Sequence, residues 1–108
     1  MDTFHFHAPP VEKIKIGDLR PMQFVACRYD NFWWIGLIQK IDAEFNDIEI
    51  KFMHPHGPTK SFHWPHRDDI CFVPLNEVLC ILEALETTSG RMYSLKDKDY
   101  MKICSCLI

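Results

Sequence analysis

The residue types that bind zinc gather in one short stretch of this 108-residue chain. The stretch contains four histidines and one cysteine: His54, His56, His63, His66 and Cys71. Imidazole and thiolate groups hold zinc well, but structural zinc sites repeat a compact ligand spacing that these five residues lack. Prolines at positions 55 and 65 also restrict the backbone between them. The pattern therefore favours histidines that hydrogen-bond within turns, and we expect neither a metal site nor a cofactor.

A second group of polar residues has the types needed for acid–base chemistry. Asp68 and Asp69 follow His66 closely, and carboxylates and imidazoles serve as general acids and bases. Side chains of adjacent residues in a strand diverge, however, and no serine or cysteine lies in a nucleophile motif. We therefore expect solvated turn residues here, and a chain that is not an enzyme.

Aromatic side chains provide a third kind of chemistry, which is binding. Aromatic rings supply much of the energy of protein interfaces, and their π faces attract cations. The same rings can instead fill the core of a small domain. Because Trp33 and Trp34 are adjacent, a strand would direct them to opposite faces, so at most one of them belongs to the core. The candidate binding residues are Tyr29, Trp33, Trp34, Phe52, His54, His56 and, in addition, Phe62 or Trp64.

These rings lie on apolar runs that have the features of β-strands. The runs are rich in β-branched and aromatic residues, and turn-forming residues separate them at intervals of roughly ten residues. Alternation is clearest over residues 47–52, where one face is apolar and the other is charged. We expect Ile38, Ile48 and Ile50 to lie in the core. The sequence thus predicts a mainly β protein, a small antiparallel barrel with strands at residues 24–29, 32–42, 47–52, 60–64 and 70–73.

The chain is long enough for one domain with a modest core. We expect an N-terminal arm or edge segment over residues 1–19, the barrel over 20–80, and an extension over 81–108 that packs on the barrel. Asn76 is a suitable cap for a short helix, but the apolar residues that follow also fit a strand from Val78 to Leu82. The last part of the extension has the pattern of a final strand or helix.

Charge and cysteine content restrict the partners and the compartment. The formal net charge is −3, and lysine and arginine are spread along the chain, whereas nucleic-acid-binding proteins usually have a basic patch. Five cysteines form an odd set without Cys-x-x-Cys spacing, and no signal peptide or membrane-length apolar run is evident. We expect a protein without a membrane segment or structural disulfide, in the nucleus or the cytoplasm.

Several of these runs resemble a known family. Phe-Val-Ala-Cys-Arg-Tyr-Asp from Phe24, Phe-Trp-Trp-Ile-Gly-Leu-Ile from Phe32 and Ile-Glu-Ile-Lys-Phe-Met from Ile48 resemble the Tudor type of SH3-like barrel over about residues 20–75. The later runs Lys-Phe-Met-His-Pro-His-Gly-Pro, Ser-Phe-His-Trp-Pro and Gly-Arg-Met-Tyr are similar to a domain near the carboxy end of animal proteins related to transposable elements. The Tudor resemblance implies an aromatic cage for methylated lysine or arginine, formed by Tyr29, Trp34, Phe52 and His56.

The resemblance and the residues together lead to one main functional hypothesis. We expect a non-enzymatic interaction module that binds a peptide or protein, with a methylated lysine or arginine as one candidate ligand, in a nuclear or chromatin complex. A nucleic-acid-binding barrel, as in transposases or integrases, is the alternative. A homodimerisation domain that buries exposed tryptophan and phenylalanine side chains is a further one.

Overall fold

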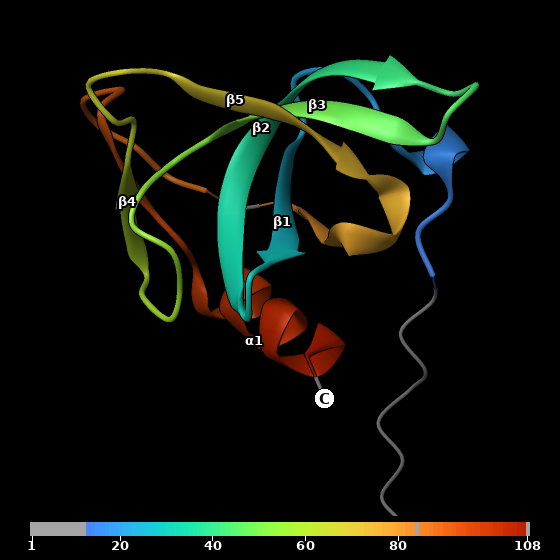
Figure 1. Cartoon of the computed structure of the whole chain (residues 1–108). Coiled ribbons are helices and arrows are strands. Elements are labelled where there is room, and N and C mark those ends of the chain that lie inside the picture. The colour runs from blue at the N-terminus through green and yellow to red at the C-terminus, as the bar shows by residue number, and fades with distance from the viewer. Residues whose placement is uncertain (1–12, 84, 108) are drawn as a thin grey trace, which may run out of the picture.

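The computed structural model describes residues 13–83 and 85–107, and its largest element is an antiparallel sheet of five strands (Figure 1). The strand order is β5-β3-β2-β1-β6. The strands are β1 (Phe24–Tyr29), β2 (Phe32–Asp42), β3 (Asp47–Phe52), β5 (Asp69–Pro74) and β6 (Val78–Leu82). The protein is therefore mainly β, as the sequence predicts. Residues 1–12, which include most of the expected N-terminal arm, lie outside the described part of the chain.

Turn chemistry and alternation explain the first three strands. Asp30 and Asn31 form a two-residue loop between β1 and β2, and both have positive φ angles, 54° and 69°. Such angles suit the tight turn that matches the twist of a hairpin, and short polar side chains tolerate them. β2 carries a bulge between Ile38 and Lys40 and bends strongly along its length (Figure 1).

Both faces of the sheet are covered, so the protein has two core clusters. The first core cluster consists of Leu19, Val25, Cys27, Ile38, Ile48, Ile50, Phe52, Val73 and Val78. The second core cluster consists of Ala26, Trp33, Ile35, Met53, Phe62, Cys80, Leu82, Leu95 and Ile103. The prediction that Ile38, Ile48 and Ile50 are core residues is confirmed, since all three are fully buried. β2 contributes to both clusters, which explains why it is apolar on both faces.

The prediction that residues 60–64 form a strand of the barrel is wrong in its pairing. Ser61–His63 does form a strand, β4, but it pairs with β7 (Met92–Ser94) in a separate two-stranded sheet. The reason lies at the end of β3, where Met53 N–H donates to the carbonyl of Ile35 and the chain then leaves the ladder. β4 begins beyond that departure and finds its partner in the C-terminal extension.

The fifth strand of the main sheet comes instead from the segment after Asn76. Of the two expectations for this segment, the strand is right and the helix is wrong. A short 3-10 helix, η2 (Leu75–Glu77), leads directly into β6. β6 pairs with β1 through a bulge, and its residues contribute to both core clusters. Burial on both faces gives a nearly continuous apolar run, which helix and strand patterns share.

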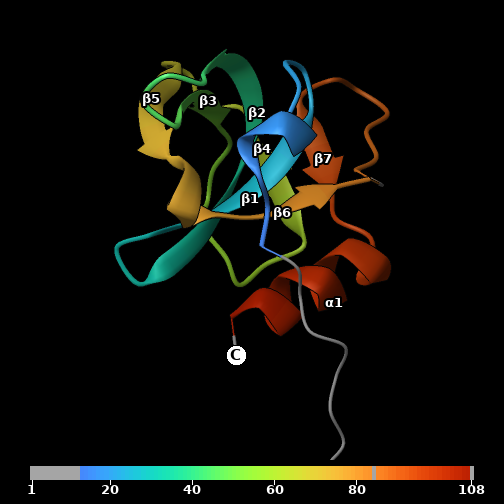
Figure 2. The same ribbon diagram turned by 90° about the vertical axis from the view of Figure 1, so that its right-hand side faces the viewer.

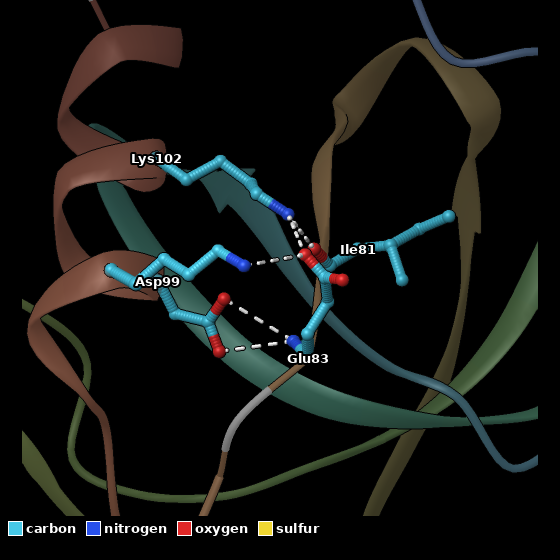
Figure 3. Close-up of polar contacts among 5 residues, drawn as sticks. Ile81, Glu83, Asp99 and Lys102 are labelled. Atoms are coloured by element: carbon cyan, nitrogen blue, oxygen red, sulfur yellow. Dashed lines mark hydrogen bonds and ion pairs between the residues drawn. The ribbon is translucent and has the colours of Figure 1, made fainter.

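The C-terminal helix α1 (Asp97–Cys106) packs against β6 and supplies Ile103 to the second core cluster. A polar clasp, shown in Figure 3, fixes it there. The buried carboxylate of Asp99 accepts hydrogen bonds from the Glu83 N–H at 3.2 and 3.0 Å. Lys102 Nζ donates to the Ile81 carbonyl at 3.0 Å and pairs with the Glu83 carboxylate at 3.1 Å.

The main sheet is strongly curved but is not closed by a hydrogen-bonded ladder. Among the described residues, no ladder joins β5 to β6, the two end strands. A 3-10 helix at Ile16–Asp18, η1, lies just before Leu19, which belongs to the first core cluster. The segment that contains η1 therefore covers part of the first core cluster.

Candidate binding site

A cavity of about 280 Å³ opens on the face of the sheet that carries the first core cluster. Strand register accounts for most of its walls. Cys27 pairs with Trp34 across β1 and β2, and Phe52 pairs with Asp69 across β3 and β5, so each pair shares a face. The lining residues are Cys27, Arg28, Tyr29, Trp34, Phe52, Asp69, Cys71 and Val73.

Three aromatic rings line this cavity at different depths. Phe52 is buried at the end of β3, and Trp34 is half-buried near the start of β2. Tyr29 is 69% exposed at the end of β1 and therefore stands at the rim. A guest in the cavity would meet an apolar floor and two rings with accessible surface. These three residues are among those that the sequence proposes for a binding site.

One carboxylate belongs to the cavity wall, that of Asp69 at the start of β5. His54 Nε2 lies 2.8 Å from Asp69 Oδ2, and the His54 ring contacts Trp34 edge-on with 5.4 Å between centroids. The hydrogen bond restricts the rotation of the carboxylate, because the imidazole is itself packed on the indole. The wall thus combines π faces with an oriented negative group. Arg28 also lines the cavity, but it pairs with Trp33, which alternates to the opposite face.

Trp34 has a polar atom that is not satisfied within the described part of the chain. Its indole Nε1 is buried and has no hydrogen-bond partner there. An indole N–H is only a donor, and a buried donor without an acceptor costs free energy. This buried donor therefore lowers the stability of the fold at a residue that lines the cavity.

His56 supports the site from the turn that follows β3. Its ring stacks on Phe32 with 3.8 Å between centroids and contacts Trp34 edge-on at 5.2 Å. His56 Nδ1 donates to the Gly57 carbonyl at 2.6 Å, and the Gly57 N–H donates to the Trp33 carbonyl at 2.8 Å. The turn is thereby bound to β2. His56 contacts a wall of the cavity but is not among its lining residues.

Gly57 is required at its position by close approach to a ring. A Cβ atom there would lie 2.0 Å from Cε2 of the Trp33 indole, far inside contact distance. Only glycine therefore lets the turn lie flat on the indole and hold His56 beside Trp34. The sequence analysis proposed His56 as a site residue but did not identify the need for glycine at position 57.

Three of the sequence-proposed site residues lie elsewhere. Trp33 and Phe62 belong to the second core cluster, where their rings contact each other with centroids 5.9 Å apart. Trp64 packs with Phe24 and Tyr93, and Lys51 Nζ lies 4.8 Å from its ring centroid. The two adjacent tryptophans thus divide between the core and the cavity, as strand alternation requires.

The sequence analysis missed part of the cavity wall on β5. Asp69, Cys71 and Val73 alternate along that strand and line the cavity together. Period-two alternation was the available signal, but it identifies a wall only when the partner strand and its register are known. Burial raises the pKa of the Cys71 thiol, and the Asp69 carboxylate raises it further. Burial likewise raises the pKa of the Cys27 thiol well above its ordinary value. Both thiols act as neutral apolar wall groups.

Neither a metal-binding group nor a membrane-spanning helix is found among the described residues. Within residues 13–83 and 85–107, no three histidine, cysteine, aspartate or glutamate side chains form a group that could hold a metal ion. No helix in this part of the chain is long and apolar enough to cross a membrane.

In comparisons with known proteins, no family model, no curated protein and no solved structure matched this chain.

Proposed function

We propose that this chain is a non-enzymatic interaction module whose cavity binds a methylated lysine or arginine side chain of a peptide or protein. The observation that carries the proposal is the joint lining of one cavity by Tyr29, Trp34, Phe52 and the Asp69 carboxylate. Methylation removes hydration and donors from a cation, so the cation gains from contact with π faces. The carboxylate adds a charge of the opposite sign at short range.

The size of the cavity supports a side chain as the guest. Sites for whole cofactors or drug-sized ligands have volumes of roughly 300 to 1,000 Å³. The cavity here, at about 280 Å³, is slightly smaller than that range and is partly open to solvent. A long side chain entering from a partner fits such a space, while the rest of the partner stays outside. The two raised thiol pKa values argue against a nucleophile in the wall.

We infer further that the main sheet belongs to the Tudor type of SH3-like barrel. The support is its strand order, in which β1, β2, β3 and β5 follow one another and β6 returns to pair with β1. β2 is strongly curved, as a strand of a small barrel is (Figure 1), and residues of β1, β2, β3 and β5 line one common cavity. The two-stranded sheet of β4 and β7 and the helix α1 are additions on the opposite face.

Titration of the protein with trimethyllysine and unmodified lysine peptides of one sequence tests the proposal. We expect the methylated peptide to bind more tightly, and Trp34→Ala to abolish binding while the far-ultraviolet circular dichroism stays unchanged. Trp64→Ala is the matched control, because Trp64 is also a half-buried tryptophan but packs outside the cavity. Affinity should vary little with salt, since a contact inside a cavity is screened weakly.

Two outcomes would contradict the proposal. Equal affinity for methylated and unmodified peptides, with the same loss in Trp34→Ala, would indicate a general protein-binding surface. Tight binding of duplex DNA that falls steeply with salt, and that Trp34→Ala leaves intact, would support the nucleic-acid alternative instead.

A further inference from the structure

The cavity lies beside a free edge of the main sheet. β5 is an end strand that pairs with β3 on one side, and among the described residues no strand lies along its other side. Figure 2 shows β5 at the outer margin of the molecule. The outward N–H and C=O groups of such a strand are a template for a further strand.

The centre of this edge, residues 70–73, lacks the features that usually prevent strand addition. Ile70 and Phe72 are 44% and 53% exposed, and Cys71 between them is also exposed. Charged residues, prolines and bulges are the common means of protecting an edge. In β5 the charged residue and the proline stand only at the two ends, at Asp69 and Pro74. The apolar, extended centre of the edge is therefore suited to receive another segment.

The same strand connects this edge to the cavity. Asp69, Cys71 and Val73 line the cavity, while Ile70 and Phe72 alternate to the other face. A segment added along β5 would also alternate, so every second side chain would lie on the cavity side. One such side chain would stand next to the Asp69 carboxylate, and the side chains between would lie against Ile70 and Phe72.

We propose that β5 receives an extended peptide as an added strand, with a methylated cationic side chain directed into the cavity and apolar side chains flanking it. The proposal rests on the proposed function, since the cavity supplies the cationic position. Charge complementarity selects this occupant, because Asp69 begins the strand and Asp68 stands just before it, with a side chain that is 60% exposed and lies 3.6 Å from Lys51 Nζ. Main-chain hydrogen bonds give such complexes affinity, and pockets for alternate side chains give them specificity.

The test separates the cavity from the edge by using two probes. Tetramethylammonium is small enough to report on the cavity alone. The second probe is a library of short peptides that have a central trimethyllysine and varied flanking residues. A control library has the same sequences but carries methyl groups on the backbone nitrogens on both sides of the trimethyllysine. Backbone methylation removes the hydrogen bonds and leaves the cation unchanged. The reference affinity is that of a single blocked residue without flanking residues, N-acetyl-trimethyllysine methylamide.

We expect the best library peptides to bind at least about tenfold more tightly than this reference compound, which corresponds to roughly 1.4 kcal/mol of binding free energy. Backbone methylation should remove this gain in affinity. The double variant Ile70→Ser and Phe72→Ser should lose the gain and keep its affinity for tetramethylammonium. Met101→Ser, which alters an exposed apolar residue of α1, is the matched control and should change neither. Amide hydrogen exchange should show new protection in β5 when the peptide is bound.

Each other result has a definite meaning. If peptides and their backbone-methylated forms bind equally, or β5 amides gain no protection, the added strand is refuted while the cavity stands. If tetramethylammonium and every peptide fail to bind, the proposed function fails as well. If the free protein sediments as a dimer with protected β5 amides, a second copy occupies the edge and the peptide proposal is overturned.

Discussion

Trp34 both lines the cavity and contacts the turn that follows β3. Its ring lines the cavity and is contacted edge-on by two histidines, His54 and His56, from the turn after β3. His54 in turn binds the Asp69 carboxylate. The position of the carboxylate and that of the indole are thus coupled. A change in the turn should therefore disturb the cavity even though neither histidine is among its lining residues.

Gly57 is the most sensitive position of that turn. Gly57→Ala introduces a Cβ that would lie 2.0 Å from the Trp33 indole, which is buried and unable to move away freely. We expect a loss of about 1–3 kcal/mol in the free energy of unfolding, measured by urea denaturation. Gly17→Ala is the control, because apart from the two chain neighbours no atom of the described residues lies within 4 Å of a Cβ there. Equal stability of the two variants would contradict the packing seen around Trp33.

At the scale of elements, α1 is held to β6 by groups that depend on ionisation. Lys102 and Lys98 lower the pKa of the Glu83 carboxylate below its ordinary value, first through the Lys102 hydrogen bond and then through both charges. A carboxyl group with a lowered pKa in the folded state stabilises the fold above its unfolded pKa. That contribution is lost as the pH falls through the lowered value, because the folded protein must then take up the proton.

Glu83→Gln should therefore flatten the dependence of stability on pH below about pH 5, where the unfolded carboxyl group begins to protonate. The measurement is the midpoint of thermal unfolding at a series of pH values from neutral to acid. Glu44→Gln, at the turn between β2 and β3, is a control, since this side chain makes none of the ion pairs between described residues. A pH profile of Glu83→Gln that coincides with that of the unaltered protein would argue against the clasp.

β3 supplies the clearest test of strand register. Ile50 is fully buried in the first core cluster, so Ile50→Ala should cost about 2–4 kcal/mol through lost burial and an added cavity. Ile70 on the neighbouring strand is 44% exposed, and Ile70→Ala should cost far less. Chemical denaturation of both variants compares the two positions directly. A loss below about 0.5 kcal/mol for Ile50→Ala would mean that the register of β3 is wrong.

At the scale of the whole molecule, the main sheet lies between the two core clusters and contributes residues to both of them. β2 places Trp33 and Ile35 in the second cluster and Ile38 in the first. The C-terminal residues complete the second cluster, because Leu95 and Ile103 are buried in it. Neither cluster can lose its packing without exposing a face of the shared sheet. We therefore treat the described chain as one cooperative unit.

This arrangement predicts that damage to either cluster lowers one common transition. Ile103→Ala removes a buried side chain from the second cluster, and Ile50→Ala removes one from the first. We expect each variant to shift a single unfolding transition, with tryptophan fluorescence and circular dichroism giving the same midpoint. Two separated transitions in the Ile103→Ala variant would instead show that the C-terminal part unfolds independently.

The sequence by itself determined the first three strands of the main sheet and the two faces of each. Residues 47–52 alternate so regularly that only one face can be buried, and adjacent Trp33 and Trp34 must diverge. Ring chemistry, strand position and the Tudor resemblance made Tyr29, Trp34 and Phe52 binding candidates, and all three line the cavity. The strands and their faces could be predicted because alternation and turn chemistry are local properties that do not depend on which strands become neighbours.

Only the tertiary structure decided how those elements combine. It assigned Ser61–His63 to a pair with β7, made Val78–Leu82 the fifth strand, and placed Trp33 rather than Trp34 in the core. Each of these outcomes depends on contacts between residues far apart in the chain. The cavity has the same origin, since Asp69 faces Phe52 only because β5 pairs with β3 in one register. A shift of one residue in that register would turn Asp69 away from the cavity, and no local sequence pattern contains this information.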